Sequence, residues 1–216
     1  MPALKTLSRI LPVAAITASL LVAAPAADAG KKKDKSVTAK IALGDKRPVK
    51  ARATKVKATK AAAPCENTTV LPSAENLEVV RAAILCLHNQ IRAENDLPTL
   101  RDNSKLRKAA LAHSSSMVSG GFFDHTSPSG DTFVDRILQA GYAKRNDAWT
   151  IGENLAWGTG ELSTPQAIMN AWMNSAGHKA NIVKKAYKEV GISVRLGVPT
   201  DAGVGATVTA DFGAKV

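Results

Sequence analysis

The chain from Cys65 to Val216 is predicted to fold as an α+β domain with antiparallel strand pairing. Three observations predict this class. Several stretches repeat apolar residues at helical spacing, and others have the composition and alternation of strands. The predicted helices outnumber the strands and do not alternate regularly with them, which argues against a doubly wound parallel sheet. The segment is also long enough for one well-buried core and contains no internal repeat.

The domain is predicted to begin with two helices. The first is expected over about residues 75–95, where apolar side chains recur at i, i+4, i+7 and i+11 before the stretch DLPTL breaks the pattern. Asn103 or Ser104 is expected to cap the second helix, which ends at the pair Gly120-Gly121.

Two further helices are predicted from their caps. Thr132 and Asp135 resemble a capping box before a short apolar stretch, and Gly141 ends that helix. Thr164 precedes Pro165 in the arrangement of a cap residue followed by proline at the first helical position.

Strands are predicted between these helices and at the end of the chain. The stretches are WTIGENLAW at residues 149–157, EVGISVRL at 189–196 and GATVTADFG at 205–213. Because the last two are separated by GVPTDAG, which is rich in turn-forming residues, they are expected to pair as a hairpin.

Residues 1–29 have the features of a secretory signal peptide. Lys5 and Arg9 precede an apolar run, which ends in the small residues around Asp28. Prolines and polar residues make the run a poor permanent membrane span, and an uncleaved anchor is the alternative. We therefore expect an exported protein that is extracellular, at the cell envelope.

Residues 30–63 are predicted to form a disordered basic linker. Residues 31–63 hold twelve Lys or Arg and two Asp, whereas residues 64–216 hold fifteen basic and fifteen acidic residues, so the net charge of +11 lies almost wholly outside the domain. The linker contains no aromatic residue, which disfavours nucleic acid as its partner. Either it contacts an anionic envelope polymer or lipid surface, or it is a solvated spacer.

Cys65 and Cys86 are the two cysteines of the chain. In an exported protein, a small and even number of cysteines suggests a disulfide. Such a bond would join the segment before the first helix to that helix. A pair of buried thiols is the alternative.

Two of the four histidines are candidates for a functional site. His88 and His113 lie on or beside the apolar stripes of the first two helices and are expected to be structural. His125 lies in a turn-rich loop, and His178 lies near a helix start that favours a neutral imidazole. With Glu153 they would form a two-histidine, one-carboxylate set that suits a divalent metal, zinc most naturally. Their wide spacing matches no short ligand motif, so spacing alone leaves this set open.

Six stretches in order along the chain carry a family resemblance: HNQIRAENDLPTL, HSSSM, FFDHTSPSG, GENLAWG, AWMNSAGHKANI and EVGISV. Together they resemble the CAP superfamily (cysteine-rich secretory proteins, antigen 5 and pathogenesis-related proteins), in particular its bacterial, SCP-like branch. The resemblance implies that residues 64–216 form a three-layer α-β-α sandwich with a central antiparallel sheet. It also implies that Glu153 lines a central cavity together with His125 and His178.

The chain departs from the family pattern in this cavity. Many eukaryotic members carry a second cavity glutamate a few residues after the tryptophan of the fourth helix. Here Asn174 or Ser175 stands at that point, and both are expected to line the ligand cavity with Glu153. The departure puts in doubt an acid pair for general acid–base catalysis.

Three functions are compatible with these residues. Family members include lipid or sterol binders and, less securely, hydrolases, so the resemblance does not fix an activity. The favoured hypothesis is a secreted, envelope-associated binding protein with a metal-capable polar cavity and a small lipid-like molecule as one candidate ligand. The second is a metal-dependent hydrolase that uses His125, His178 and Glu153, although no separate general base is evident. The third is a structural module whose cavity residues only hydrogen-bond to one another.

Overall fold

The computed structural model of the chain describes residues 64–215. The signal peptide expected at residues 1–29 and the basic linker expected at 30–63 lie outside the described residues. Along the described chain the elements are α1 (Leu77–Glu94), β1 (Arg101–Asp102), α2 (Ser104–Gly120), α3 (Phe133–Gln139), β2 (Trp149–Thr159), the 3-10 turn η1 (Gly160–Ser163), α4 (Pro165–Met173), α5 (Ala176–Ile182), β3 (Glu189–Leu196) and β4 (Gly205–Lys215).

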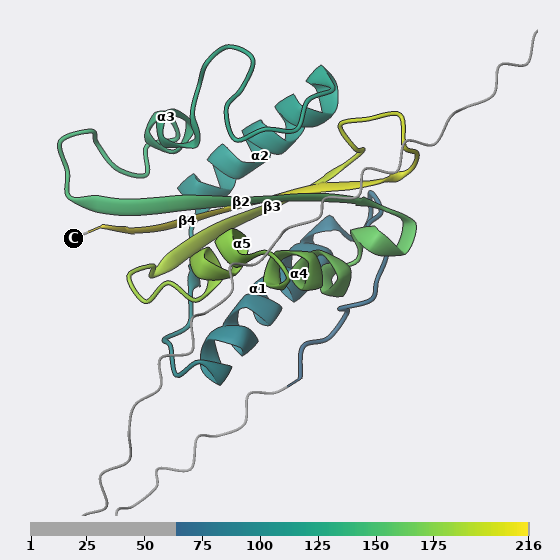
Figure 1. Cartoon of the computed structure of the whole chain (residues 1–216), viewed down its shortest axis with the longest axis horizontal. Helices are drawn as coiled ribbons and strands as arrows, with labels where there is room; N and C mark the ends of the chain where they lie inside the picture. The colour runs from purple at the N-terminus through teal and green to yellow at the C-terminus, as the bar shows by residue number, and fades with distance from the viewer. Residues whose placement is uncertain (1–63, 216) are drawn as a thin grey trace, which may run out of the picture. The chain divides into compact units, whose positions relative to one another are not determined.

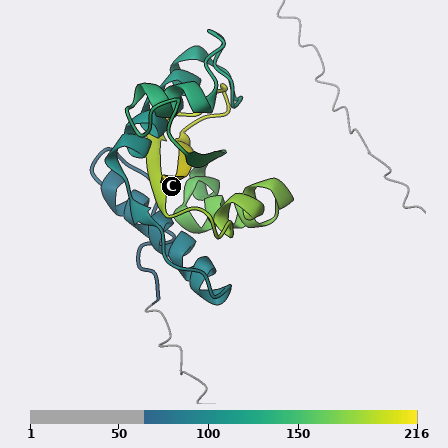
Figure 2. The ribbon, with the colours of Figure 1, turned by 90° about the vertical axis from the view of Figure 1, so that its left-hand side faces the viewer.

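These elements form three layers, as the family resemblance implies. Figure 1 shows the sheet edge-on, with α2 and α3 on one side and α1, α4 and α5 on the other. The view in Figure 2, turned by 90°, shows the same two helical layers with the sheet between them. Within residues 64–215, no helix is long and apolar enough to cross a membrane.

The sheet has the strand order β1-β3-β4-β2. β3 and β4 form the predicted hairpin, and β2 pairs antiparallel with β4 along its whole length. β1 differs from the sequence prediction, because it is a two-residue strand that pairs parallel with the start of β3. The backbone N–H of Asn103 donates to the carbonyl of Val190 and holds β1 in place. A strand of this length is too short to show a hydrophobic period.

The predicted helix starts are confirmed. The Asn103 side chain accepts hydrogen bonds from two backbone N–H groups in the first turn of α2. Thr132 and Asp135 form a complete capping box at the start of α3. Thr164 caps α4, and Pro165 occupies its first turn. Caps of this kind typically stabilise a helix by about 1 kcal/mol, because they satisfy backbone N–H groups that have no partner within the helix.

The two faces of the sheet differ in polarity. On β4, Val208, Ala210 and Phe212 belong to the larger core, which packs under α1 and α4. The alternate residues point to the opposite face, beneath α2. There the Ser114 hydroxyl on α2 lies 2.7 Å from the Thr209 hydroxyl on β4. The face toward α2 and α3 can therefore carry polar and charged side chains.

His88 is a structural residue, as its place beside the apolar stripe of α1 predicted. Its buried ring lies 5.5 Å from that of Trp172 and 5.6 Å from that of Phe212, measured between centroids. Its Nδ1–H donates to the carbonyl of Ile84 at 2.8 Å. Burial lowers the pKa of His88 to about 4, so the ring is neutral within the core at ordinary pH.

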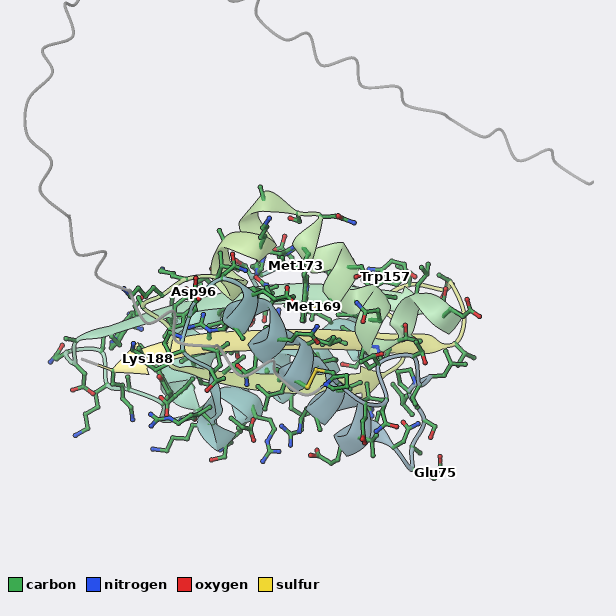
Figure 3. The ribbon with its side chains drawn as sticks, turned by 90° about the horizontal axis from the view of Figure 1, so that it is seen from below. Glu75, Asp96, Trp157, Met169, Met173 and Lys188 are labelled. Atoms are coloured by element: carbon green, nitrogen blue, oxygen red, sulfur yellow. A yellow bond between two sulfur atoms is a disulfide. The ribbon has the colours of Figure 1, made fainter. Side chains whose placement is uncertain are left out.

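Cys65 and Cys86 form the predicted disulfide. The bond ties the segment before α1 to the middle of that helix, and Figure 3 shows it in yellow beside α1. The two cysteines are 21 residues apart, so the bond closes a short loop of the unfolded chain.

We predict that replacing both cysteines by serine lowers the free energy of unfolding by about 3 kcal/mol, because the loop is no longer closed in the unfolded state. Thermal melting of the variant beside the wild type measures this as a lower Tm. Wild-type protein with its disulfide reduced serves as the control and should have the same Tm as the variant. An unchanged Tm in both would show that the cross-link does not stabilise the domain.

Candidate functional site

The site is built around the buried carboxylate of Glu153. Its side chain is 1% exposed, although β2 is an edge strand. Arg136 of α3 covers it, and Nη2 of Arg136 donates to Oε1 at 3.1 Å and to Oε2 at 2.8 Å. A carboxylate in this environment needs such a partner, because burial without one costs several kcal/mol.

Arg136 also fixes the loop that carries His125. Its Nη2 donates to the carbonyl of His125 at 2.9 Å, and its Nη1 donates to the carbonyl of Asp131 at 2.9 Å. From α2, the Nε2–H of His113 donates to the carbonyl of Asp124 at 2.9 Å. Burial lowers the pKa of His113, which favours this neutral form. The loop before α3 is thus held from two helices, and His113 has the structural role that the sequence predicted.

His125 packs against Glu153 with one nitrogen and faces solvent with the rest of its ring. Its Nδ1 lies 2.8 Å from Oε1 of Glu153, and its side chain is 51% exposed. Because the carboxylate can only accept, Nδ1 carries the proton, and Nε2 of the neutral ring is left with a free lone pair. The hydrogen bond to Glu153 raises the pKa of His125 against the opposing effect of burial.

His178 approaches β2 from the other helical layer. It lies on α5, and its backbone carbonyl accepts a hydrogen bond of 3.0 Å from Nδ2 of Asn154. Asn181, one turn further along α5, donates to Oδ1 of Asn154 at 2.9 Å. Burial lowers the pKa of His178, and the nearby His125 lowers it further. A neutral ring was predicted from the helix start, but the dominant cause in the structure is burial.

The stretch Gly-Glu-Asn of β2 therefore contacts both helical layers. Successive side chains of a strand point to opposite faces, so Glu153 reaches α3 while Asn154 reaches α5. The third residue, Gly152, has to be glycine, because a side chain there would collide with the hydroxyl of Tyr187. That hydroxyl donates to the carbonyl of Ile151 at 2.9 Å.

Asp211 is a second buried acid that the sequence reasoning missed. It lies on β4 directly opposite Glu153 and is 1% exposed. Burial and the negative charge of Glu153 raise the pKa of Asp211 well above its usual range, which favours the neutral acid. Within residues 64–215, neither of its oxygens has a hydrogen-bond partner. The sequence offered one signal for Asp211, an acid on the polar side of a strand with alternating apolar residues. Its proximity to Glu153 depends on the pairing of β2 with β4, which the sequence does not show.

Arg136 was also missed, because one arginine in a short helix has the pattern of an ordinary surface charge. The residues expected at the family's second-glutamate position lie nearby in sequence but do not join the network. Asn174 is an exposed C-cap of α4, and Ser175 is the N-cap of α5. Among the described residues, neither side chain hydrogen-bonds to His125, Glu153 or His178.

The arrangement leaves two histidines as candidate metal ligands. In the part of the chain that the structure describes, no three His, Cys, Asp or Glu residues are grouped closely enough to hold a metal ion. Both oxygens of Glu153 accept hydrogen bonds from Arg136, and one also accepts from His125. Glu153 therefore fits the role of a residue that orients His125 better than the role of a ligand.

We predict that Arg136→Met lowers the free energy of unfolding by about 3–5 kcal/mol, because it leaves a buried carboxylate without its partner. The double variant Arg136→Met/Glu153→Gln should be more stable than Arg136→Met alone. Urea denaturation measures both differences.

The matched control is Arg145→Met, which breaks the exposed ion pair of Arg145 with Asp135 and should change stability far less. If Arg136→Met and Arg145→Met were equally mild, Arg136 would not be what compensates Glu153.

Comparisons with known proteins identify the family of the chain. The model of the CAP family, described as the cysteine-rich secretory protein family, matches residues 85–207. The Bacillus subtilis protein YkwD is 33% identical over 159 residues, covering 73% of this chain and 58% of YkwD. The B. subtilis membrane protein YlbC is 31% identical over 111 residues, covering 51% of this chain and 30% of YlbC. The chain thus spans less than two thirds of both relatives.

Two solved structures match parts of this chain. An outer surface protein of Borrelia burgdorferi has a TM-score of 0.51 at 20% identity, covering 68% of this chain and 97% of that one. An extracellular SCP-domain protein of Bacillus anthracis has a TM-score of 0.48 at 26% identity, covering 64% of this chain and 40% of that one. With the family match over more than half of its length, the chain belongs to the CAP family, in its bacterial, SCP-like form.

Proposed function

We propose that this protein is an exported CAP-domain protein that binds a ligand at the cell envelope. We further propose that His125 and His178 bind a divalent metal, zinc by preference, at the binding site. The observation that carries the proposal is the 2.8 Å hydrogen bond between Nδ1 of His125 and Glu153, on a ring that is half exposed.

This geometry suits a metal-binding histidine. Histidines that bind metals usually donate their second ring N–H to a carboxylate, which fixes the tautomer and the orientation of the ring. Glu153 supplies that carboxylate, and the lowered pKa of His178 keeps a second imidazole neutral nearby. Imidazole nitrogen suits zinc better than magnesium or calcium. A zinc ion held by two protein ligands would offer its other positions, as a Lewis acid, to water or to a donor group of the ligand.

Binding is favoured over hydrolysis by the state of the two acids. A general base must reach the water or hydroxyl from which it takes a proton. Glu153 is enclosed and accepts from Arg136 and His125, and Asp211 is buried with a pKa raised by burial and by the charge of Glu153. Neither acid is placed to act as a base toward a molecule at the exposed side of His125.

We also propose that the basic segment of residues 31–63 holds the protein at an anionic envelope polymer or lipid surface. Its twelve basic and two acidic residues support this, and so does the neutrality of residues 64–216. Export through the signal sequence at residues 1–29 would place the segment at such a surface. The attraction is electrostatic, so screening by salt should weaken it.

We predict that zinc binds the wild-type protein with measurable heat and that His125→Ala and His178→Ala each abolish the binding. Glu153→Gln should weaken it, because the ring of His125 loses its fixed tautomer. Asn174→Ala is the control and should bind like the wild type. Equal heats from wild type and His125→Ala would instead support the purely structural role of these residues.

The same titration should depend on pH in a defined direction. A protonated imidazole cannot bind a metal, and the raised pKa of His125 means that protons begin to compete above the ordinary histidine value of about 6.5. Affinity should therefore fall steadily as the pH is lowered from about 8 to about 6. A constant affinity over this range would exclude His125 as a ligand.

We predict that deleting residues 31–63 reduces co-sedimentation with isolated cell envelopes at low salt, with no change in the Tm of the domain. Wild-type co-sedimentation should itself decline between low and physiological ionic strength. Full binding by the deletion variant would mean that the segment is only a spacer.

A further inference from the structure

We infer that a second site, in a groove at the end of β4, binds phosphate groups of an anionic polymer or lipid headgroup. The groove has a volume of about 530 Å³. It lies between Lys105 at the start of α2, the connection from α3 to β2, and Lys215 at the end of β4. Figure 2 looks onto this end of the domain. Glu153, Arg136 and the two site histidines do not line the groove, so this inference does not rest on the histidine site.

Positive charges dominate the lining of the groove. Its charged residues are the cations Lys105, Lys144, Arg145 and Lys215 and the acids Asp135 and Asp147. The two acids are already engaged in local structure. Asp135 accepts from Thr132 in the capping box and pairs with Arg145 at 2.9 Å. Asp147 accepts from the backbone N–H of Lys144 at 2.8 Å.

The three lysines of the groove are available to pair with a ligand. Among residues 64–215, Lys105, Lys144 and Lys215 form no ion pair with a carboxylate. Nζ of Lys215 lies 5.1 Å from the centroid of the Tyr142 ring, which forms part of the wall. The first turn of α2 contains no acidic residue, so the positive end of its helix dipole adds to the field at Lys105.

This local excess of positive charge contrasts with the domain as a whole, in which basic and acidic residues are equal in number. Residues 64–216 hold fifteen basic and fifteen acidic residues. A groove lined by four cations and two engaged acids is thus a specific feature of this end of the molecule. Its volume lies in the range that holds small ligands, about 300–1,000 Å³, which fits one headgroup or one repeat of a polymer.

The cations of the groove can bind phosphate. Planar carboxylates are best held by the two-pronged guanidinium of arginine, and the one arginine here already pairs with Asp135. Lysine ammonium groups also bind phosphate, as point charges. Leu138 adds apolar surface for the carbon backbone of a polyol or glycerol unit.

The test compares two triple variants of the full chain with equal loss of charge. Lys105→Gln/Lys144→Gln/Lys215→Gln alters the groove. Lys179→Gln/Lys185→Gln/Arg195→Gln removes three exposed cations outside it. The probes are a soluble poly(glycerol phosphate) and vesicles of phosphatidylglycerol, at low salt. The basic segment of residues 31–63 is present in all the proteins, so its contribution is the same in each.

We expect the groove variant to bind at least one probe about tenfold more weakly than wild type, as the combined effect of three exposed charge contacts. The control variant should stay close to wild type. Backbone amide shifts in NMR spectra of the wild type should change over residues 138–145 on addition of the soluble polymer or of glycerol phosphate.

Binding of the polymer alone, or of the vesicles alone, identifies the source of the phosphate and supports the site in either case. Equal weakening of both triple variants would overturn the inference, because binding would then depend on total charge. Unchanged affinity of the groove variant for both probes, at an unchanged Tm, would overturn it as well.

Discussion

The buried carboxylate of Glu153 is the constraint on which the rest of the site depends. A charge at this position would cost several kcal/mol if it had no partner. Arg136 therefore has to be present, and α3 has to dock over β2 to deliver it. Since Arg136 also binds the carbonyl of His125, the same contact fixes the loop before α3. One ion pair thus determines the position of a helix, a loop and an imidazole.

Because of this constraint, the exposed imidazole of the network lies on its outer side. Glu153 and Asp211 are both buried, Glu153 is balanced by Arg136, and the pKa of Asp211 is raised by burial and by the charge of Glu153. The exposed part of the network is His125. Its hydrogen bond to the buried Glu153 places the proton of the neutral ring on Nδ1. On the opposite face, Asn154 anchors α5 and so brings His178 to the same strand. His125 and His178 thus approach one edge strand from the two helical layers.

Sequence reasoning recovered the elements that depend on local chemistry. Thr132 with Asp135 predicted a helix start, because a cap involves residues close together in the chain. The motifs of the family supplied His125, Glu153 and His178. Arg136 and Asp211 were out of reach, since their importance depends on how β2, β4 and α3 meet. Asp211 lies opposite Glu153 only in the observed register, which brings together two residues that are far apart in the chain.

The protonation of the His125 ring is the most direct measure of this account. Nitrogen-15 NMR of the imidazole reports which ring nitrogen carries the proton and how it titrates. We predict that the neutral ring carries its proton on Nδ1, that its pKa lies above the ordinary histidine value, and that Glu153→Gln lowers that pKa. A proton on Nε2, or a pKa unaffected by Glu153→Gln, would show that the buried carboxylate does not set the state of the exposed imidazole.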